Sequence, residues 1–289
     1  GLSMRALCKR NLKIYFSNSV TVFFSLLGGL IVFGLYLLFL RKNMVTQFDN
    51  LTDGPIIADF WVLGGILATT SLTTSFTALS QFIKDKAENK FMDFIITGKK
   101  ASHLLSGYFL SGLIISFCMQ VAVLILCLVY FNFQENSQFT FTFMMGLKAL
   151  GIILLSSLNA TAINLIVCTL IKTESTLRTI SNILGAISGF MCTAYLPIGS
   201  FSGFTETIIK MLPISYASSS FRRIFISPII TDMPHEQLLT LKEYLGIGYI
   251  WNDHITTATM DIIILVITTI FCLLVLSLCG KKIAQVSLS

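Results

Sequence analysis

Charged residues are scarce in this sequence. Asp, Glu, Lys and Arg make up 12% of the 289 residues, about half of the share that is usual in soluble domains. Hydrophobic residues make up 54%, and the chain contains 24 Phe. This composition excludes disordered, collagen-like and ordinary cytosolic proteins. It also lacks the basic face on a soluble module that reading of nucleic acid bases requires.

Catalytic and metal-binding motifs are absent as well. The sequence has no GxxxxGK[ST] loop to hold nucleotide phosphates. His235-Glu236 begins like a zinc-protease motif, but Leu239 stands where the second histidine is needed. The seven cysteines form no CxxC pair and fall mostly in apolar stretches, so we interpret them as packing residues. We expect a chain that is not an enzyme and that binds no metal or cofactor itself.

What the sequence has instead is a series of long apolar runs. In lipid every backbone polar group must be satisfied within the protein, so apolar runs of about 18 residues or more predict spanning helices. We predict an all-α membrane protein with one transmembrane domain over residues 1–289. Six spans are expected, at about residues 20–40, 57–79, 103–131, 145–171, 179–198 and 256–279. Arg41 and Lys42 are expected to stop the first.

Three further segments are expected to be helical without spanning the membrane. Residues 4–17 combine an apolar face with a basic stripe, which is typical of a helix that lies in the membrane interface. Residues 81–100 form the most charged stretch and predict an amphipathic helix on the cytosolic side that ends near Gly98. Residues 199–254 predict short re-entrant or surface helices on the outer side, with Pro213 breaking the first.

The distribution of bases predicts the orientation. Thirteen Lys and Arg lie in the N-terminal helix, the 81–100 segment, the 172–178 turn and the C-terminus, against six in the segments expected on the opposite side. Because basic residues stay on the cytosolic side, both termini are expected in the cytosol.

Polar side chains within the expected spans have two interpretations. Residues 68–80 are rich in Ser and Thr, and Thr70, Thr74 and Thr77 form one line along a helix. These hydroxyl side chains either allow close packing of helices or line a water-filled path. As a hypothesis, six residues from three spans line a cargo path: Thr70, Thr74, Thr77, Asn159, Asn164 and Ser188.

Three ionisable residues fall near the outer ends of expected spans: Asp59, Lys148 and Asp261. One interpretation is that Lys148 reaches water along its own stem. The alternative is an outer gate in which one of the acids pairs with Lys148, beneath a cap where Arg222 or Arg223 bonds to carbonyls or acids.

Two local motifs and the order of elements carry a family resemblance. After the second span the sequence places two acids, Glu88 and Asp93, among apolar residues and before Thr97. Before the last span it reads Leu212-Pro213-Ile214-Ser215-Tyr216 and then Phe221-Arg222. With these motifs the chain resembles the ABC-2 type permease family, the membrane halves of ATP-binding-cassette exporters.

The resemblance implies partners and a mechanism. A separate ABC ATPase subunit, which carries ATP and Mg, would dock on the 81–100 segment, and two permease copies, identical or different, would form the path within membrane lipid. Bacterial cell membrane is the implied location. The cargo would be an amphiphilic drug, antibiotic, toxin or lipid. The docking residues would be Glu88, Phe91, Asp93, Phe94 and Ile95.

The alternative class is a secondary transporter or channel that an ion gradient drives. Such carriers usually have carboxylates near mid-membrane and often have internal repeats, and the sequence shows neither.

Overall fold

The computed structural model describes residues 4–48, 51, 53–96, 98, 100–133 and 141–286, with side chains up to residue 278. Thr97 of the first motif lies outside these residues.

Helices make up nearly all of the described chain, as the sequence predicts for an all-α membrane protein. In chain order they are α1 (Met4–Ser17), α2 (Ser19–Ser25), α3 (Leu27–Leu35), the π-helical η1 (Tyr36–Leu40), α4 (Arg41–Gln47), α5 (Gly54–Ala87), α6 (Lys90–Ile96), α7 (Ala101–Asn132), α8 (Phe143–Leu170), α9 (Glu174–Met191), the 3₁₀-helical η2 (Ile198–Ser200), α10 (Gly203–Met211), α11 (Pro213–Ile226), α12 (His235–Leu245) and α13 (Ala258–Val286). Strands β1 (Ile250–Trp251) and β2 (His254–Ile255) form a small antiparallel pair.

Within the described residues, five helices are long and apolar enough to cross a membrane: Leu27–Gln47, Gly54–Ala87, Ala101–Asn132, Phe143–Leu170 and Ala258–Leu278. They correspond to five of the six expected spans. The remaining expected span, at residues 179–198, overlaps α9, an 18-residue helix that is not among the helices long and apolar enough to cross a membrane. A total of six spans therefore stays a prediction.

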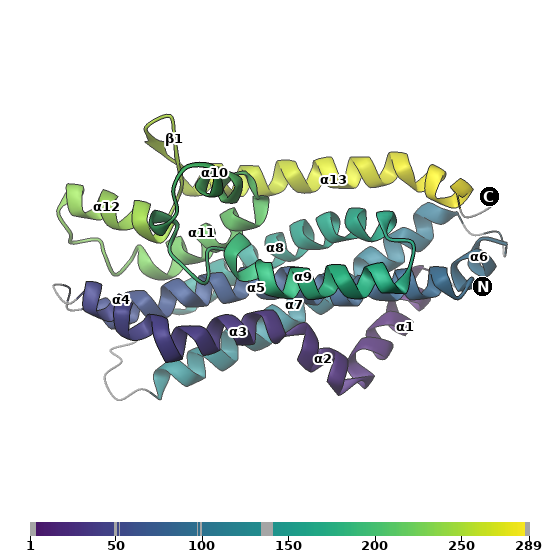
Figure 1. Cartoon of the computed structure of the whole chain (residues 1–289), viewed down its shortest axis with the longest axis horizontal. Helices are drawn as coiled ribbons and strands as arrows, with labels where there is room; N and C mark the ends of the chain where they lie inside the picture. Colours follow the sequence, from purple (N-terminus) through teal and green to yellow (C-terminus); the bar gives the residue numbers. More distant parts are fainter. Residues whose placement is uncertain are drawn as a thin grey trace.

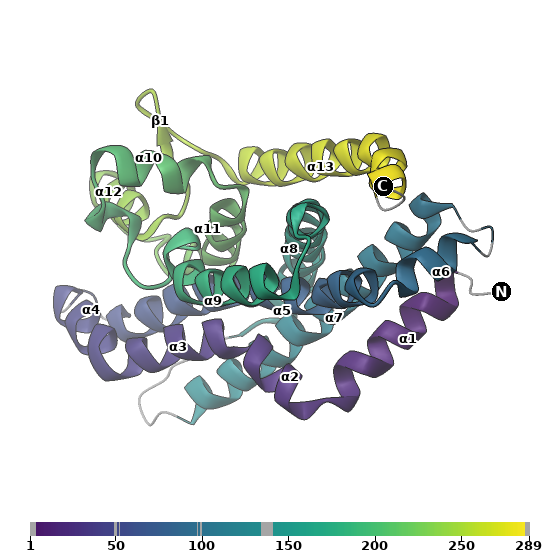
Figure 2. The ribbon, with the colours of Figure 1, turned by 45° about the vertical axis from the view of Figure 1, so that its right-hand side comes forward.

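The long helices run along the long axis of the molecule, with α5 in the middle of the bundle (Figure 1). Helix α5 packs against α3, α7, α8, α9 and α11. One end of the bundle, the α6 end, holds the start of α1, helix α6, the α8–α9 turn and the end of α13 (Figures 1 and 2). The opposite end, the α12 end, holds α4, α10, α12 and the strand pair. The four base-rich segments thus lie together at the α6 end.

The helix boundaries correct two expectations. Arg41 does not stop the first helix, which continues as α4 to Gln47, because the Arg41 side chain pairs with Asp59 inside the protein. Residues 81–100 do not form one helix: α5 continues to Ala87, the short α6 follows, and α7 begins at Ala101. Asn89, with a left-handed φ of 61°, separates α5 from α6.

Two other boundaries agree with the sequence. Helix α1 occupies the predicted residues 4–17, exposes its basic stripe of Arg5, Lys9 and Lys13, and packs its apolar face on α7. Pro213 separates α10 from α11 as its first residue, because proline is well suited to a first helical position. Helix α11 then packs between α5, α8 and α13.

Candidate functional site

Asp85 is the centre of a buried charge cluster at the α6 end. Its carboxylate has no exposed surface and accepts two hydrogen bonds from the Arg10 guanidinium, at 2.6 and 2.8 Å. Tyr108 and Gln81 donate to it at 2.6 and 2.8 Å. The hydrogen bonds to Asp85 raise the pKa of Arg10. This Asp85 cluster joins α1, α5 and α7. Helix α6 packs against α5 at the same end.

The amphipathic helix that the sequence predicts over residues 81–100 would place the charged Asp85 on its solvated face, but the structure buries the carboxylate. Phe82 and Ile83 are buried beside it, so the last turns of α5 are enclosed on several sides. The signal that could have revealed the pair is Arg10, which stands outside the exposed basic stripe of α1.

The structure divides the five expected docking residues into an inner and an outer group. Phe91 is fully buried and packs edge-on against Phe82, with ring centroids 5.3 Å apart. The expectation that Phe91 inserts into a partner is therefore wrong in this conformation, because its ring fills the chain's own core. Phe94 is half-buried with the Arg10 guanidinium 6.0 Å from its ring centroid. Ile95 is also half-buried.

The outer group of α6 is largely polar. Glu88 and Asp93 are exposed, and Glu88 forms an ion pair with Lys90. Ile96 is 77% exposed, and the sequence analysis did not single it out. The exposed side of this region therefore carries the Asp93 carboxylate, the Glu88–Lys90 ion pair and the apolar side chain of Ile96.

The threonines expected along a cargo path point into the protein instead. Thr70 and Thr74 have no exposed surface, and each hydroxyl donates to a carbonyl of its own helix. Helix α3 approaches this stretch closely, with Gly29 against Thr70 and Gly28 against Thr69 and Thr73. The path assignment of Thr70 and Thr74 is therefore wrong in this conformation, and their role is helix packing.

Thr77 differs from its two neighbours because it is half-buried and lines a cleft of about 450 Å³ between α5 and α9 at the α6 end. Lys84 and Arg178 line the same cleft. Of the predicted threonine line, only its last member thus reaches an open space.

The three other expected path residues are buried and join helices. The Asn159 amide donates to Thr268 and Thr269 of α13, at 2.8 and 3.1 Å. The Asn164 amide donates to the Leu72 carbonyl of α5 at 2.8 Å. Ser188 of α9 lies against Gly28 of α3.

Sequence reasoning missed a further buried group of this kind. Gln120 of α7 donates to Ser157 at 2.7 Å and accepts from Ser156 at 2.9 Å. Its position in an apolar run was the available signal.

The two expected gate acids pair with arginines at the α12 end. Asp59 accepts hydrogen bonds from Tyr36 and from Arg41, the latter at 3.0 Å. Asp261 accepts from Arg223 at 3.1 Å, from Ser219 at 2.7 Å and from Thr256 at 2.6 Å. Lys148 is exposed, and the ion pairs of both acids are with other residues. The expected pair of Lys148 with either acid is therefore wrong in this conformation.

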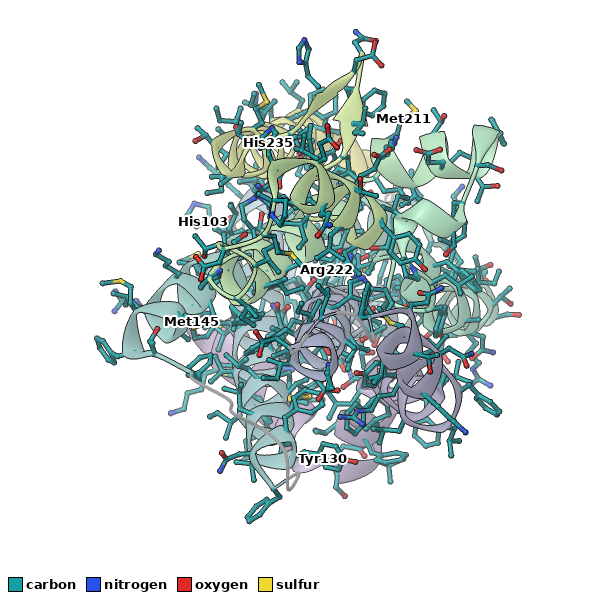
Figure 3. The ribbon with its side chains drawn as sticks, turned by 90° about the vertical axis from the view of Figure 1, so that its left-hand side faces the viewer. His103, Tyr130, Met145, Met211, Arg222 and His235 are labelled. Carbon is teal, nitrogen blue, oxygen red and sulfur yellow. The ribbon has the colours of Figure 1, made fainter. Side chains whose placement is uncertain are left out.

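Arg222 is a buried cation whose described partners are all neutral. Its side chain has no exposed surface and lies near the centre of the molecule seen from the α12 end (Figure 3). It donates to the carbonyls of Trp61 at 3.1 Å, Leu245 at 3.2 Å and Thr193 at 2.8 Å, and to the Thr193 hydroxyl at 2.6 Å. The guanidinium also lies 4.9 Å from the Trp61 ring centroid. Burial lowers the pKa of Arg222 to about 10. As expected, Arg222 bonds to carbonyls; it joins α5, α11, the segment after α9 and the end of α12.

Comparison with protein families gives one match. The family described as ABC-2 type transporter matches residues 3–226. A search of curated proteins found no matching relative. Within the described residues there is no group of three or more His, Cys, Asp or Glu side chains that could hold a metal ion.

Proposed function

Because this chain belongs to the ABC-2 type transporter family and is an integral membrane protein and permease subunit, we propose that it forms one half of an exporter. An ABC ATPase subunit binds ATP and Mg and drives the export. Two permease copies rock between inward-open and outward-open states and carry an amphiphilic drug, antibiotic, toxin or lipid. The termini lie in the cytosol of a bacterial cell.

The observation that best supports this function is the construction of the α6 end. Helix α6 exposes Asp93 and Ile96 to a partner, Glu88 is exposed just before the helix, and Phe91 anchors the helix in the core. The Asp85 cluster beneath it ties α1, α5 and α7 together. A force applied to α6 is therefore transmitted to α1, α5 and α7 together.

An exposed apolar face of α9 supports the proposal of a second permease copy. Ile183, Ile187 and Phe190 are 51%, 44% and 46% exposed, and they lie at helical spacing on one side. We assign this face to contact with the partner permease.

The experiment is to express the chain with a candidate ABC ATPase and to purify the complex through a tag on this chain alone. The complex in liposomes should retain the ATPase, and cargo should stimulate its ATP hydrolysis. Transport that persists with an ATPase unable to hydrolyse ATP, and that stops when an ionophore collapses the ion gradient, would contradict the proposal and favour the ion-driven alternative.

A further inference from the structure

A cleft at the α12 end is separate from the ion pairs of Asp59 and Asp261. It has a volume of about 460 Å³ and lies between the starts of α5 and α8 and the turn that follows α11. Figure 3 places Met145, one of its lining residues, well to the side of Arg222. The cleft is therefore separate from the group of residues that bind the Arg222 side chain.

Among the described residues that line the cleft, one is positive and one is negative: Lys148 and Asp53. Lys148 is exposed and Asp53 is half-buried. In the part of the chain that the structure describes, neither side chain forms an ion pair or a hydrogen bond with the protein. The acids Asp59 and Asp261 are already bound to arginines. Two opposite charges in one cleft are thus available to a ligand.

The two charges stand at different depths. Asp53 directly precedes α5, so it lies where that helix starts. Lys148 lies five residues beyond Phe143, the first residue of α8, which is about 7.5 Å along the helix axis. The positive charge is therefore attached farther along its helix than the negative charge, which precedes its own helix.

Apart from Thr142, the remaining lining residues are apolar. Ile56 and Phe60 line the cleft from α5, and Met144 and Met145 from α8. Met144 is 55% exposed. Methionine has a flexible and polarizable side chain that fits irregular apolar partners. Such a wall suits hydrocarbon chains.

We propose that this cleft binds one phospholipid whose zwitterionic headgroup carries a primary amine, the phosphoethanolamine class. Lys148 donates to the phosphate, and Asp53 accepts from the ammonium group. In such a lipid the phosphate is nearer the acyl chains and the amine is farther out, which is the order of depth of Lys148 and Asp53. The acyl chains contact Ile56, Phe60 and Met144. One cation and one anion in the cleft match the zero net charge of the headgroup.

The test is native mass spectrometry of the purified full chain in detergent with equal amounts of phosphatidylethanolamine, phosphatidylcholine and phosphatidylglycerol. Phosphatidylethanolamine should bind about tenfold better than the other two, the effect of one hydrogen bond to a charged group. Asp53→Asn should remove this preference, whereas Lys148→Gln should weaken binding of all three lipids, because all three carry the phosphate, and Lys148→Arg should keep both binding and preference. Lys42→Gln is the matched control, because Lys42 is also exposed and lies on α4 at the same end.

Three results would overturn the proposal: equal binding of the three lipids, a preference for phosphatidylglycerol, or unchanged selectivity in folded Asp53→Asn protein. Soluble glycerophosphoethanolamine, which lacks acyl chains, should fail to displace the bound lipid. Displacement by it would show that the apolar wall contributes nothing and would also overturn the assignment. Should Lys148→Gln fail to fold, Asp53→Asn decides alone. The measurement needs no ATPase, so its result is independent of the proposed export.

Discussion

At the scale of single residues, the buried charges differ in the partners that neutralise them. Asp85 and Asp59 are bound to Arg10 and Arg41, whereas the described partners of Arg222 are carbonyls, a hydroxyl and an aromatic ring. A buried charge without a counter-charge persists only when its hydrogen bonds are complete. The planar guanidinium, with five donors, meets that need where an ammonium group does not.

Replacement of Arg222 by lysine should therefore destabilise the protein although the charge is kept. Lysine cannot reproduce four hydrogen bonds in a fixed fork and the contact with the Trp61 ring, and each lost hydrogen bond of a buried charge costs about 1.5–3 kcal/mol. We expect a clearly lower thermal unfolding midpoint in detergent. Arg178→Lys is the control, because the Arg178 side chain is 80% exposed. An unchanged midpoint for Arg222→Lys would contradict the structure.

The Arg10–Asp85 pair should show energetic coupling, whereas Lys148 should show none with Asp59. A double-mutant cycle of Arg10→Gln and Asp85→Asn, measured by unfolding in SDS, should give a coupling of about 1–3 kcal/mol. The lower part of this range is expected, because the Arg10 side chain is 27% exposed and solvent screens it. The cycle of Lys148→Gln and Asp59→Asn is the comparison. Coupling in the second cycle with none in the first would reverse the assignment of partners.

At the scale of elements, helix α3 can lie against α5 because small residues line the contact. A Cβ on Gly28 would stand 2.9 Å from Cγ2 of Thr73 and 3.1 Å from the Ser188 hydroxyl. A Cβ on Gly34, in the same helix, would meet no atom within 4 Å. The two glycines therefore differ in their surroundings, although the sequence alone shows them as equals.

Gly28→Val should disturb the contact of α3 with α5 and α9, and Gly34→Val should be tolerated. Both variants place the same residue in the same helix, so the loss of glycine flexibility is matched. Overpacking of a tight contact costs roughly 1–3 kcal/mol. Yield after solubilisation and the thermal unfolding midpoint measure the effect. Equal behaviour of the two variants would show that α3 does not pack at Gly28.

Sequence patterns predicted where helices form, and failed to show which side chains of other helices cover them. Residues 4–17 and the break at Pro213 follow from local rules and agree with the structure. The apolar runs gave the long helices for the same reason. The end of α5 was predicted as a solvated surface, because periodicity does not show that Arg10, distant in sequence, covers Asp85. For the same reason the hydroxyl-rich stretch of α5 left open whether helices or water face it.

At the scale of the whole molecule, α5 connects the two ends of the bundle. Asp59 near its start binds Arg41, and Asp85 near its end binds Arg10. Helix α5 as a whole spans 34 residues, and its two acids are 26 residues apart, about 39 Å along the helix axis. The N-terminal segment α1–α4 is thus attached to α5 at both ends and packed on it through Gly28 in between. A displacement at α6 should therefore move α5 and this segment as one body.

Helix α6 should accordingly separate docking from stability when its two sides are changed in turn. Ile96→Ser removes a side chain that is 77% exposed, so retention of the ATPase should fall while the unfolding midpoint stays constant. Phe91→Ala removes a buried ring, which typically costs about 3–5 kcal/mol, so the midpoint should fall. Leu170→Ser is the control, because Leu170 is 75% exposed at the same end of the bundle but lies outside α6. Unchanged ATPase retention by Ile96→Ser, or an equal loss with Leu170→Ser, would remove α6 as the specific contact and leave the α6 end without an assigned docking surface.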